Sequence, residues 1–219
     1  FGGYVSAPAY LAAYLLRVPI IIHEANAKPG LANRFGALFA QIIFISFARA
    51  KSAGDRWLSA TNSGLPIKSE IDNFDFQNVA RNKELFLNSL GLEKKRTLLV
   101  FGGSLGAQKL NQVINKCAAD IANLNWNLIH VVGGKNETTK SSRNFSSLHY
   151  IDDMSGAYAA ADFVICRAGA VTCAELMAVG VPALLIPLPI GNGEQVANAQ
   201  ELVDSGPVSY THLTLPTKA

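Results

Sequence analysis

The hydrophobic positions of this chain fall into short apolar runs that alternate with segments of helical spacing. Early in the chain, "VPIIIHE" and "IIFIS" have the composition of buried strands, whereas "APAYLAAYLL" and "GLANRFGALFA" have the pattern of helices. Continuous apolar strands that alternate with helices are typical of a parallel sheet covered on both faces. The pattern therefore predicts an α/β fold.

A polar, turn-rich stretch, "NSGLPIKSEIDNFD", follows these elements and predicts a linker between two units. Beyond it the strand pattern returns in "RTLLVF", "WNLIHVVG", "LHYI", "DFVIC" and "PALLIPL". The helix after "GGSLGA" is expected to present one apolar face, formed by Leu110, Val113, Ile114, Cys117, Ile121 and Leu124. We therefore expect two doubly wound, Rossmann-like domains, residues 1–66 and 67–206, with a cleft between them.

The two ends of the chain depart from this pattern. The sequence opens in a strand-to-helix turn, "FGGYVSAPAY", so we expect a piece of a longer protein whose N-terminal domain is incomplete. At the other end, "PVSYTHLTLPTKA" does not continue the preceding pattern. Residues 207–219 are therefore interpreted as a non-native tail.

Composition narrows the function classes. Hydrophobic residues make up 49% of the chain, charged residues only 16%, and the net charge is +3, so we expect no nucleic-acid partner. Cys117, Cys166 and Cys173 show no CxxC spacing and are interpreted as reduced core residues, with neither a disulfide nor a zinc site. The longest apolar window is too short for a membrane span.

In doubly wound folds ligands bind beyond the carboxyl ends of the strands, so the loops there are the candidates for chemistry. "VFGGSLGAQ" suits a phosphate: Gly102 and Gly103 let the backbone approach, Ser104 adds a hydroxyl donor, and a helix N-terminus follows. A purely structural turn is the competing interpretation. The loop lacks the dinucleotide fingerprint, because Phe101 stands where its first glycine should be.

Three further loops carry polar residues in apolar surroundings. In "FVICRAGAVTCAE", Glu175 either interacts with the helix dipole or accepts hydrogen bonds from a vicinal diol such as a ribose. His23, at a strand end before Glu24, is either structural or a catalytic base. "GNGEQVANA" places three polar residues at a helix start, and capping explains one of them but hardly all: Glu194, Gln195 and Asn198.

Taken together, these loops resemble one known family. The motifs "FGGYVSAP", "HEAN" with "PGLAN", "GLPIK", "GGSLGA", "YIDDM" with "ICRAGAVTCAE", "GVPALLIP" and "EQVANA" occur in that order across residues 1–206. They are similar to those of the MurG family of peptidoglycan UDP-N-acetylglucosamine transferases. The resemblance implies a GT-B fold and an inverting transfer of N-acetylglucosamine from its UDP conjugate to undecaprenyl-diphospho-muramoyl-pentapeptide, which turns lipid I into lipid II.

The resemblance also implies roles for individual residues. Ser104 would bind the diphosphate, and the backbone of Ile151 would contact uracil. Glu175 would hold the ribose hydroxyls, at the end of a nucleoside-binding segment made of Ala170, Val171, Thr172, Cys173, Ala174 and Glu175. Asn26 and Gln195 would hold the sugar. Lys68 stands where many members carry an arginine, and it can neutralise a phosphate without forming a bidentate fork.

No cofactor and no metal site are expected, because the motif accounts for Asp152 and Asp153 without a metal. His23 is the candidate base within this chain, and the chain by itself is expected to be inactive. The lipid acceptor implies peripheral contact with the cytoplasmic face of the bacterial membrane, through an apolar patch with Arg17, Lys28 and Arg34. The alternatives are another GT-B lipid or natural-product glycosyltransferase, and a non-catalytic nucleotide-sugar-binding module.

Overall fold

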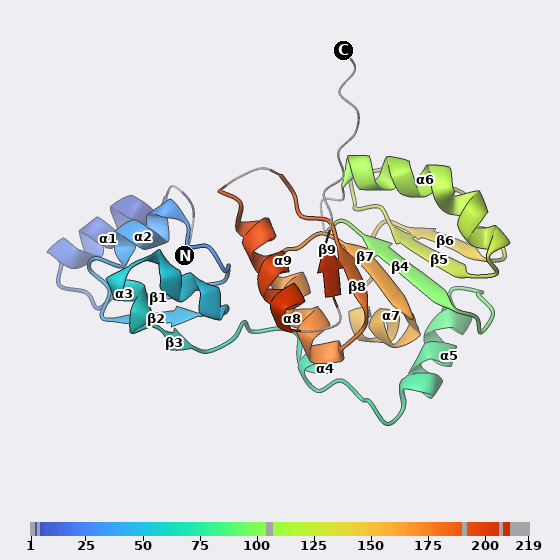
Figure 1. Ribbon diagram of the computed structural model, residues 1–219, viewed down its shortest axis with the longest axis horizontal. Helices are drawn as coiled ribbons and strands as arrows, with labels where there is room; N and C mark the ends of the chain where they lie inside the picture. The colour runs from blue at the N-terminus through green and yellow to red at the C-terminus, as the bar shows by residue number, and fades with distance from the viewer. Residues whose placement is uncertain (1–2, 4, 104–106, 190–191, 206–207, 211–219) are drawn as a thin grey trace, which may run out of the picture. The chain divides into compact units, whose positions relative to one another are not determined.

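The computed structural model describes residues 3, 5–103, 107–189, 192–205 and 208–210 (Figure 1). The chain divides into two compact units. Unit 1 comprises Phe1–Pro66, Ala168–Ala174 and Pro187–Gly206, and unit 2 comprises Ile67–Arg167, Glu175–Ile186 and Pro207–Ala219. The first break lies between Pro66 and Ile67, within the stretch that the sequence marks as a linker.

Unit 1 contains a parallel sheet in the order β1 (Ile21–Glu24), β2 (Ile42–Ile45), β3 (Thr61–Asn62). Its helical elements are α1 (Ser6–Leu15), α2 (Leu31–Gly36), the 3-10 helix η1 (Ala48–Ala53), α3 (Asp55–Leu58) and α9 (Glu194–Ser205). Burial alternates along β1 and β2, so that Ile22 and Ile45 are enclosed while Ile21 and Ile42 are 60% and 45% exposed. The strands predicted here are present, but among the described residues only one face of this sheet is well buried.

Helices α1 and α2 of unit 1 pack closely because α2 ends in a glycine. A side chain at Gly36 would lie 2.5 Å from the ring of Tyr10, which fills that space. The Tyr10 hydroxyl donates to Oδ1 of Asn33 on α2 at 2.8 Å. The sequence pattern suggested a longer helix here, and α2 stops where this contact is made.

Unit 2 is built on a fully parallel six-stranded sheet in the order β6-β5-β4-β7-β8-β9. The strands are β4 (Thr97–Phe101), β5 (Asn127–Val131), β6 (Phe145–Leu148), β7 (Phe163–Cys166), β8 (Ala183–Leu185) and β9 (Val208–Tyr210). The helices are α4 (Ser69–Asp72), α5 (Val79–Ser89), α6 (Gln108–Asn123), α7 (Met154–Ala160) and α8 (Ala170–Val179), the last of which begins in unit 1. The α/β class predicted from the pattern is confirmed.

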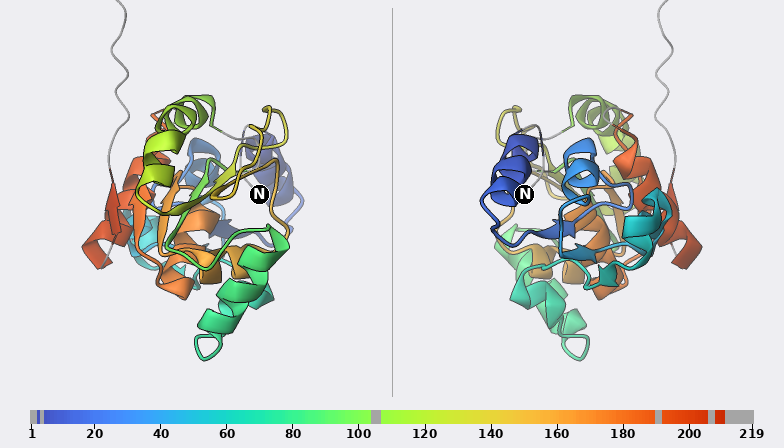
Figure 2. Two further views of the ribbon diagram at one scale, coloured as in Figure 1. Left: turned by 90° about the vertical axis from the view of Figure 1, so that its right-hand side faces the viewer. Right: turned by 90° about the vertical axis from the view of Figure 1, so that its left-hand side faces the viewer.

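Helices cover both faces of the unit 2 sheet, with α6 on one side and α5 and α7 on the other (Figures 1 and 2). Every residue of β4 and β5 is buried, as expected for central strands of a doubly wound sheet. On the α6 side, Leu110 and Ile114 pack against Leu98 and Val100 of β4. The predicted apolar face of α6 is thus present, except that Leu124 follows the end of the helix and is 70% exposed.

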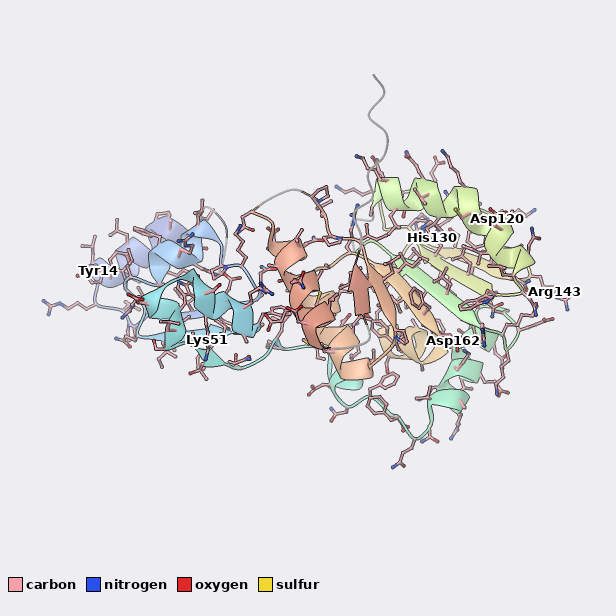
Figure 3. The ribbon with its side chains drawn as sticks, viewed as in Figure 1. Tyr14, Lys51, Asp120, His130, Arg143 and Asp162 are labelled. Carbon is pink, nitrogen blue, oxygen red and sulfur yellow. The ribbon has the colours of Figure 1, made fainter. Side chains whose placement is uncertain are left out.

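Asp162 anchors the amino ends of the two central strands (Figure 3). Its Oδ2 accepts a hydrogen bond from the backbone N–H of Thr97 at 2.7 Å and pairs with Nζ of Lys83 on α5 at 2.5 Å. One carboxylate therefore ties α5 to the starts of β4 and β7.

Strand β9 belongs to the segment in which the sequence pattern predicts a non-native tail. Val208 pairs with Ala183 and Tyr210 with Leu185, in parallel register. Residues 207 and 211–219 lie outside the described part of the chain.

Among the described residues, no helix combines the length and the apolar character that crossing a membrane requires.

Candidate functional site

The order of strands in unit 2 locates a candidate site. The chain adds β5 and β6 on one side of β4, then returns to place β7, β8 and β9 on the other side. Phe101, the last residue of β4, pairs with Cys166, the last residue of β7. The loops after these two strands therefore diverge from neighbouring points at the carboxyl edge. Ligands of doubly wound sheets bind at this switch point.

The first loop at the switch point leads from β4 into the long helix α6. Gly103 has φ +90°, a backbone conformation that favours glycine, and apart from its chain neighbours no atom of the described residues lies within 4 Å of the place where its Cβ would stand. That open side is suited to a ligand approaching the backbone. Ser104, expected to bind the diphosphate, lies outside the described residues.

The second loop leads from β7 into α8 and is held by Arg167. The guanidinium donates to the backbone oxygen of Ile186, beyond β8, at 3.0 Å, and burial lowers the pKa of Arg167. In the first turns of α8, Val171 is exposed, Ala170, Thr172 and Ala174 are half-buried, and Cys173 is fully buried. Burial raises the pKa of the Cys173 thiol to about 12, so Cys173 is neutral and can face a ligand only through its backbone.

Glu175 occupies the second turn of α8, and the first turn carries no acidic residue. Because the influence of a helix dipole fades within the first turn, the structure disfavours the dipole interpretation. The carboxylate is half-buried, and its Oε2 accepts a hydrogen bond from the Tyr158 hydroxyl at 2.8 Å. Burial raises the pKa of Glu175, while the Tyr158 hydrogen bond and the charge of Lys68 act in the opposite direction.

The remaining predicted residues of unit 2 lie on neighbouring loops. Lys68 is exposed and donates to the backbone oxygen of Asp152 at 3.3 Å, beside a pocket of about 620 Å³ lined by residues 68–71 and 152–155. Ile151 buries its side chain between β6 and α7. Asp153 caps α7: its Oδ1 accepts from the backbone N–H of Gly156 at 2.8 Å. The acidic pair is thus accounted for in part by helix capping.

The predicted residues of unit 1 surround a buried carboxylate, Glu24. Its Oε1 accepts from the backbone N–H of Asn26 at 2.9 Å, and its Oε2 accepts from Asn33 Nδ2 at 2.8 Å and from the N–H of Gly30 at 3.2 Å. Three loop and helix groups thus converge on one side chain. Glu24 shapes the loop that carries Asn26.

Asn26 is held from a second direction by α9. The fully buried Asn198 donates from Nδ2 to Asn26 Oδ1 at 3.1 Å and accepts from the N–H of Ala27 at 2.7 Å. Gln195 lies one turn earlier on α9, and its Oε1 accepts from the N–H of Leu188 at 2.9 Å. Asn26 also lines a unit 1 pocket of about 680 Å³ with Glu24, Lys28, Asn33, Phe35 and Glu194.

His23 makes a structural contact. Its Nε2 lies 3.0 Å from the backbone oxygen of Gly64, which also accepts from the Ser46 hydroxyl at 3.2 Å. A carbonyl oxygen can only accept, so Nε2 carries the proton in this contact. The contact fixes the ring against the "GLP" turn, and the basic lone pair of the neutral ring is then on Nδ1.

Two residues of these networks are not marked as functional by the sequence pattern. Tyr158 sits in "MSGAYAAAD", where it reads as one more apolar residue of a small-residue helix. Glu24 was noted only as a neighbour of His23. In both cases the available indication was a polar group in a run that is otherwise buried.

Among the described residues, no group of three or more His, Cys, Asp or Glu side chains is arranged to hold a metal ion.

Comparisons with known proteins agree on one family. Residues 1–45 match the glycosyltransferase family 28 N-terminal domain, and residues 97–212 match the glycosyltransferase family 28 C-terminal domain. Relatives from Thermobifida fusca and Streptomyces coelicolor are 44% and 45% identical over 94% of this chain. Both are named UDP-N-acetylglucosamine–N-acetylmuramyl-(pentapeptide) pyrophosphoryl-undecaprenol N-acetylglucosamine transferase.

Solved structures show the same likeness. Acinetobacter baumannii MurG is 30% identical and superimposes with a TM-score of 0.69, over 97% of this chain and 58% of that one. The glycosyltransferase of kitacinnamycin, at 15% identity and a TM-score of 0.63 over 96% of this chain and 62% of its own, shares the fold. The chain spans about half the length of the curated relatives it matches: 54% of the first and 56% of the second.

Proposed function

Because this chain belongs to glycosyltransferase family 28 and has the GT-B-type fold of its relatives, we propose that the protein is an inverting glycosyltransferase. It moves N-acetylglucosamine from UDP-N-acetylglucosamine to undecaprenyl-diphospho-muramoyl-pentapeptide, as the relatives' names indicate. The observation that carries the proposal is Glu175, a half-buried carboxylate on the helix that follows the switch point of the unit 2 sheet.

The UDP half of the donor is bound by helix α8 and by the loops that follow β4 and β6. Glu175 accepts hydrogen bonds from the ribose hydroxyls, and the backbone of Ala170–Ala174 in α8 borders the nucleoside. The backbone of Ile151 contacts uracil, with its buried side chain anchoring that loop. The open side of Gly103 admits the diphosphate near the start of α6, where Ser104 adds a donor.

The sugar of the donor is held by two polar side chains. Asn26, oriented by Glu24 and Asn198, and Gln195 on α9 bind the hydroxyl and acetamido groups of N-acetylglucosamine. Lys68 of unit 2 supplies positive charge for a phosphate, as a single ammonium group and not as a bidentate fork.

In the reaction, a sugar hydroxyl of the acceptor attacks the anomeric carbon and loses its proton to a base. The bond from that carbon to the diphosphate oxygen breaks through an oxocarbenium-like transition state, and UDP leaves with the electron pair. Backbone N–H groups at the starts of α6 and α8 stabilise the negative charge that grows on the leaving diphosphate. The base is not assigned; His23 is the candidate within this chain, because a ring that donates from Nε2 to Gly64 has its basic lone pair on Nδ1.

The acceptor is a polyprenyl lipid, so the protein docks peripherally on the cytoplasmic face of the bacterial membrane. Support comes from α1 and α2, whose exposed apolar side chains include Leu11, Tyr14, Leu15, Leu31 and Phe35. Arg17 and Arg34 are exposed beside them. Apolar groups flanked by basic ones are suited to an anionic lipid surface.

The decisive test is Glu175→Ala in the intact protein, with UDP binding measured by calorimetry. Hydrogen bonds to a charged group contribute about 1.5–3 kcal/mol each, so we expect a loss of affinity on the order of tenfold or more. Glu175→Gln should lose less, because it keeps one acceptor oxygen. The Glu175→Ala deficit should shrink when 2′-deoxy-UDP replaces UDP.

Two outcomes would contradict this assignment. Unchanged UDP affinity alongside a lowered melting temperature would make Glu175 a structural carboxylate only. An equal deficit for UDP and 2′-deoxy-UDP would place its effect away from the 2′-hydroxyl. Transfer of labelled sugar to a lipid I analogue by the intact protein tests the reaction itself, and binding without turnover would instead support a non-catalytic module.

A further inference from the structure

Tyr158 of unit 2 is a buried hydroxyl that the proposed reaction does not use directly. Helix α7 consists mainly of small residues, and all residues from Gly156 to Ala160 are buried. Tyr158 itself is fully enclosed, with its ring packed edge-on against Phe101 at the end of β4 at 6.3 Å between centroids. A phenol hydroxyl in such surroundings requires a polar partner.

The partner that the structure provides is Glu175. Oε2 of the carboxylate accepts from the Tyr158 hydroxyl at 2.8 Å, and no described residue hydrogen bonds to Oε1. An ionised carboxylate can accept about four hydrogen bonds, so this contact leaves capacity for two ribose hydroxyls. Since Tyr158 is clamped by packing, its hydroxyl also fixes the rotation of the carboxylate.

The Tyr158 hydrogen bond also affects the ionisation of Glu175. Burial raises the pKa of Glu175 and so favours the neutral acid, which would present one acceptor oxygen fewer to a diol. The Tyr158 hydrogen bond and the positive charge of Lys68 are the groups that favour the ionised form. Lys68 is exposed and screened by solvent, whereas Tyr158 is not.

We propose that Tyr158 is a positioning residue for nucleotide recognition, which holds the Glu175 carboxylate ionised and oriented toward the ribose. This inference rests on the proposed role of Glu175. It adds that the affinity for the nucleotide, and the lower end of its pH range, are set by a tyrosine that never touches the ligand. The ring contact between Tyr158 and Phe101 links this pair to the end of β4, where the proposed phosphate-binding loop begins.

The experiment is Tyr158→Phe in the intact protein, with UDP-N-acetylglucosamine as the probe. This substitution removes one oxygen atom and keeps the ring against Phe101. Titrations by calorimetry from pH 5 to pH 8 should show about three- to tenfold weaker binding at neutral pH, because a carboxylate free to rotate forms weaker hydrogen bonds with the ribose. The acidic limb of the binding curve should move to higher pH. The probe is chosen because its diphosphate, esterified at both ends, does not titrate in this range.

Two controls separate positioning from general destabilisation. Ser89→Ala removes another hydroxyl of unit 2, which donates to the backbone oxygen of Phe86 at 2.7 Å, and should leave the pH profile unchanged. In the Glu175→Ala background, Tyr158→Phe should have no further effect on affinity. A pH limb that stays in place in Tyr158→Phe, or an undiminished effect of Tyr158→Phe without Glu175, would overturn the inference.

The two variants also distinguish a failure of the ribose contact of Glu175 from a failure of the positioning role of Tyr158. If Glu175→Ala leaves binding unchanged, the proposed ribose contact fails, and this inference fails with it. If Glu175→Ala weakens binding while Tyr158→Phe does not, only the positioning role of Tyr158 is refuted.

Discussion

His130 is a fully buried histidine in the central sheet of unit 2 (Figure 3). Its Nε2 lies 3.1 Å from Asn111 Oδ1, and Asn111 in turn donates to the backbone oxygen of Val132 at 2.9 Å. Nδ1 has no hydrogen-bond partner among the described residues. Burial lowers the pKa of His130 to about 4, so the ring is neutral at physiological pH.

This imidazole makes stability depend on pH. The pKa of a histidine in an unfolded chain is about 6.5, so between that value and about 4 the unfolded state binds more protons than the folded one. The free energy of unfolding that comes from keeping His130 neutral is therefore fully present above about pH 6.5 and is lost as the pH falls toward 4. The whole shift corresponds to on the order of 3 kcal/mol.

We expect His130→Gln, which keeps a donor toward Asn111, to reduce the difference in unfolding free energy between pH 7 and pH 5. Urea unfolding at both values measures this difference. His149→Gln, at an exposed position, controls for the loss of an imidazole. Equal pH dependence in the parent protein and in His130→Gln would refute the prediction.

The sequence identified some individual residues of the site and not others. Glu175 was identifiable because a carboxylate in an apolar run requires an explanation. Tyr158 was not, because an aromatic residue in a buried helix is ordinary, and only the three-dimensional contact shows where its hydroxyl goes. Asn198 was noted at a helix start, but its partner Asn26 stands 172 residues earlier, which no local pattern encodes.

Among the elements, α7 shows a helix whose start is fixed by two residues together. Asp153 caps the first turn through the N–H of Gly156, and a Cβ at Gly156 would lie 2.3 Å from Asp153 Oδ2 and 2.7 Å from the Phe86 ring on α5. Glycine is thus needed so that the cap and the packing of α5 against α7 can coexist.

Gly156→Ala is expected to destabilise the protein by about 1–3 kcal/mol, because the added methyl group displaces both neighbours. Asp153→Ala should cost about 1 kcal/mol, the usual value of a lost N-cap. The two effects should not add fully, since they disturb the same turn. Denaturant unfolding of the two single variants and of the double variant Gly156→Ala with Asp153→Ala measures these free energies.

The matched control is Gly134→Ala. Gly134 is exposed and, its chain neighbours aside, nothing in the described part of the chain lies within 4 Å of its Cβ position. If Gly134→Ala and Gly156→Ala lowered stability equally, the close-packing explanation would be wrong.

Elements with strong periodicity were predicted well and those fixed by contacts less so. Strands β4, β5 and β7 and the amphipathic α6 follow from the pattern, because burial on both sides of a sheet leaves a continuous apolar run. The strand expected at "LHYI" was misplaced, since β6 is Phe145–Leu148 and owes little to apolar side chains. The early end of α2 does not, because the apolar pattern of "GLANRFGALFA" continues beyond Gly36, where the helix ends. Asp153 likewise appeared as half of an acidic pair until its capping role was visible.

For the molecule as a whole, the surface of α1 and α2 predicts lipid binding. Tyr14, labelled in Figure 3, stacks on Phe39 at 4.7 Å between ring centroids, and Phe35 meets the same ring at 5.3 Å. Lys28, expected in this surface, donates to the backbone oxygen of Asn192, so reversing its charge would also break an internal contact.

We therefore expect the double substitution Arg17→Glu and Arg34→Glu to weaken binding of the intact protein to anionic vesicles. Each basic residue near such a surface contributes about 1 kcal/mol, so the loss should be roughly tenfold or more and should shrink at high salt. Co-sedimentation with phosphatidylglycerol vesicles measures it. Lys109→Glu with Lys116→Glu, at exposed positions on α6, makes the same charge change elsewhere. Equal losses in both double variants would show a net-charge effect and no specific surface.

The order of strands in unit 2 has a consequence for the synthesis of the chain. Strands β4, β5 and β6 can pair as soon as they emerge from the ribosome, but the other edge of β4 must wait for β7, about 60 residues further on. At translation speeds of about 5–20 residues per second, that edge stays bare for roughly 3–12 s. An apolar strand with unpaired backbone groups is a template for pairing with other chains. The nascent protein therefore passes through an interval in which a chaperone that shields β4 would increase the yield of folded molecules.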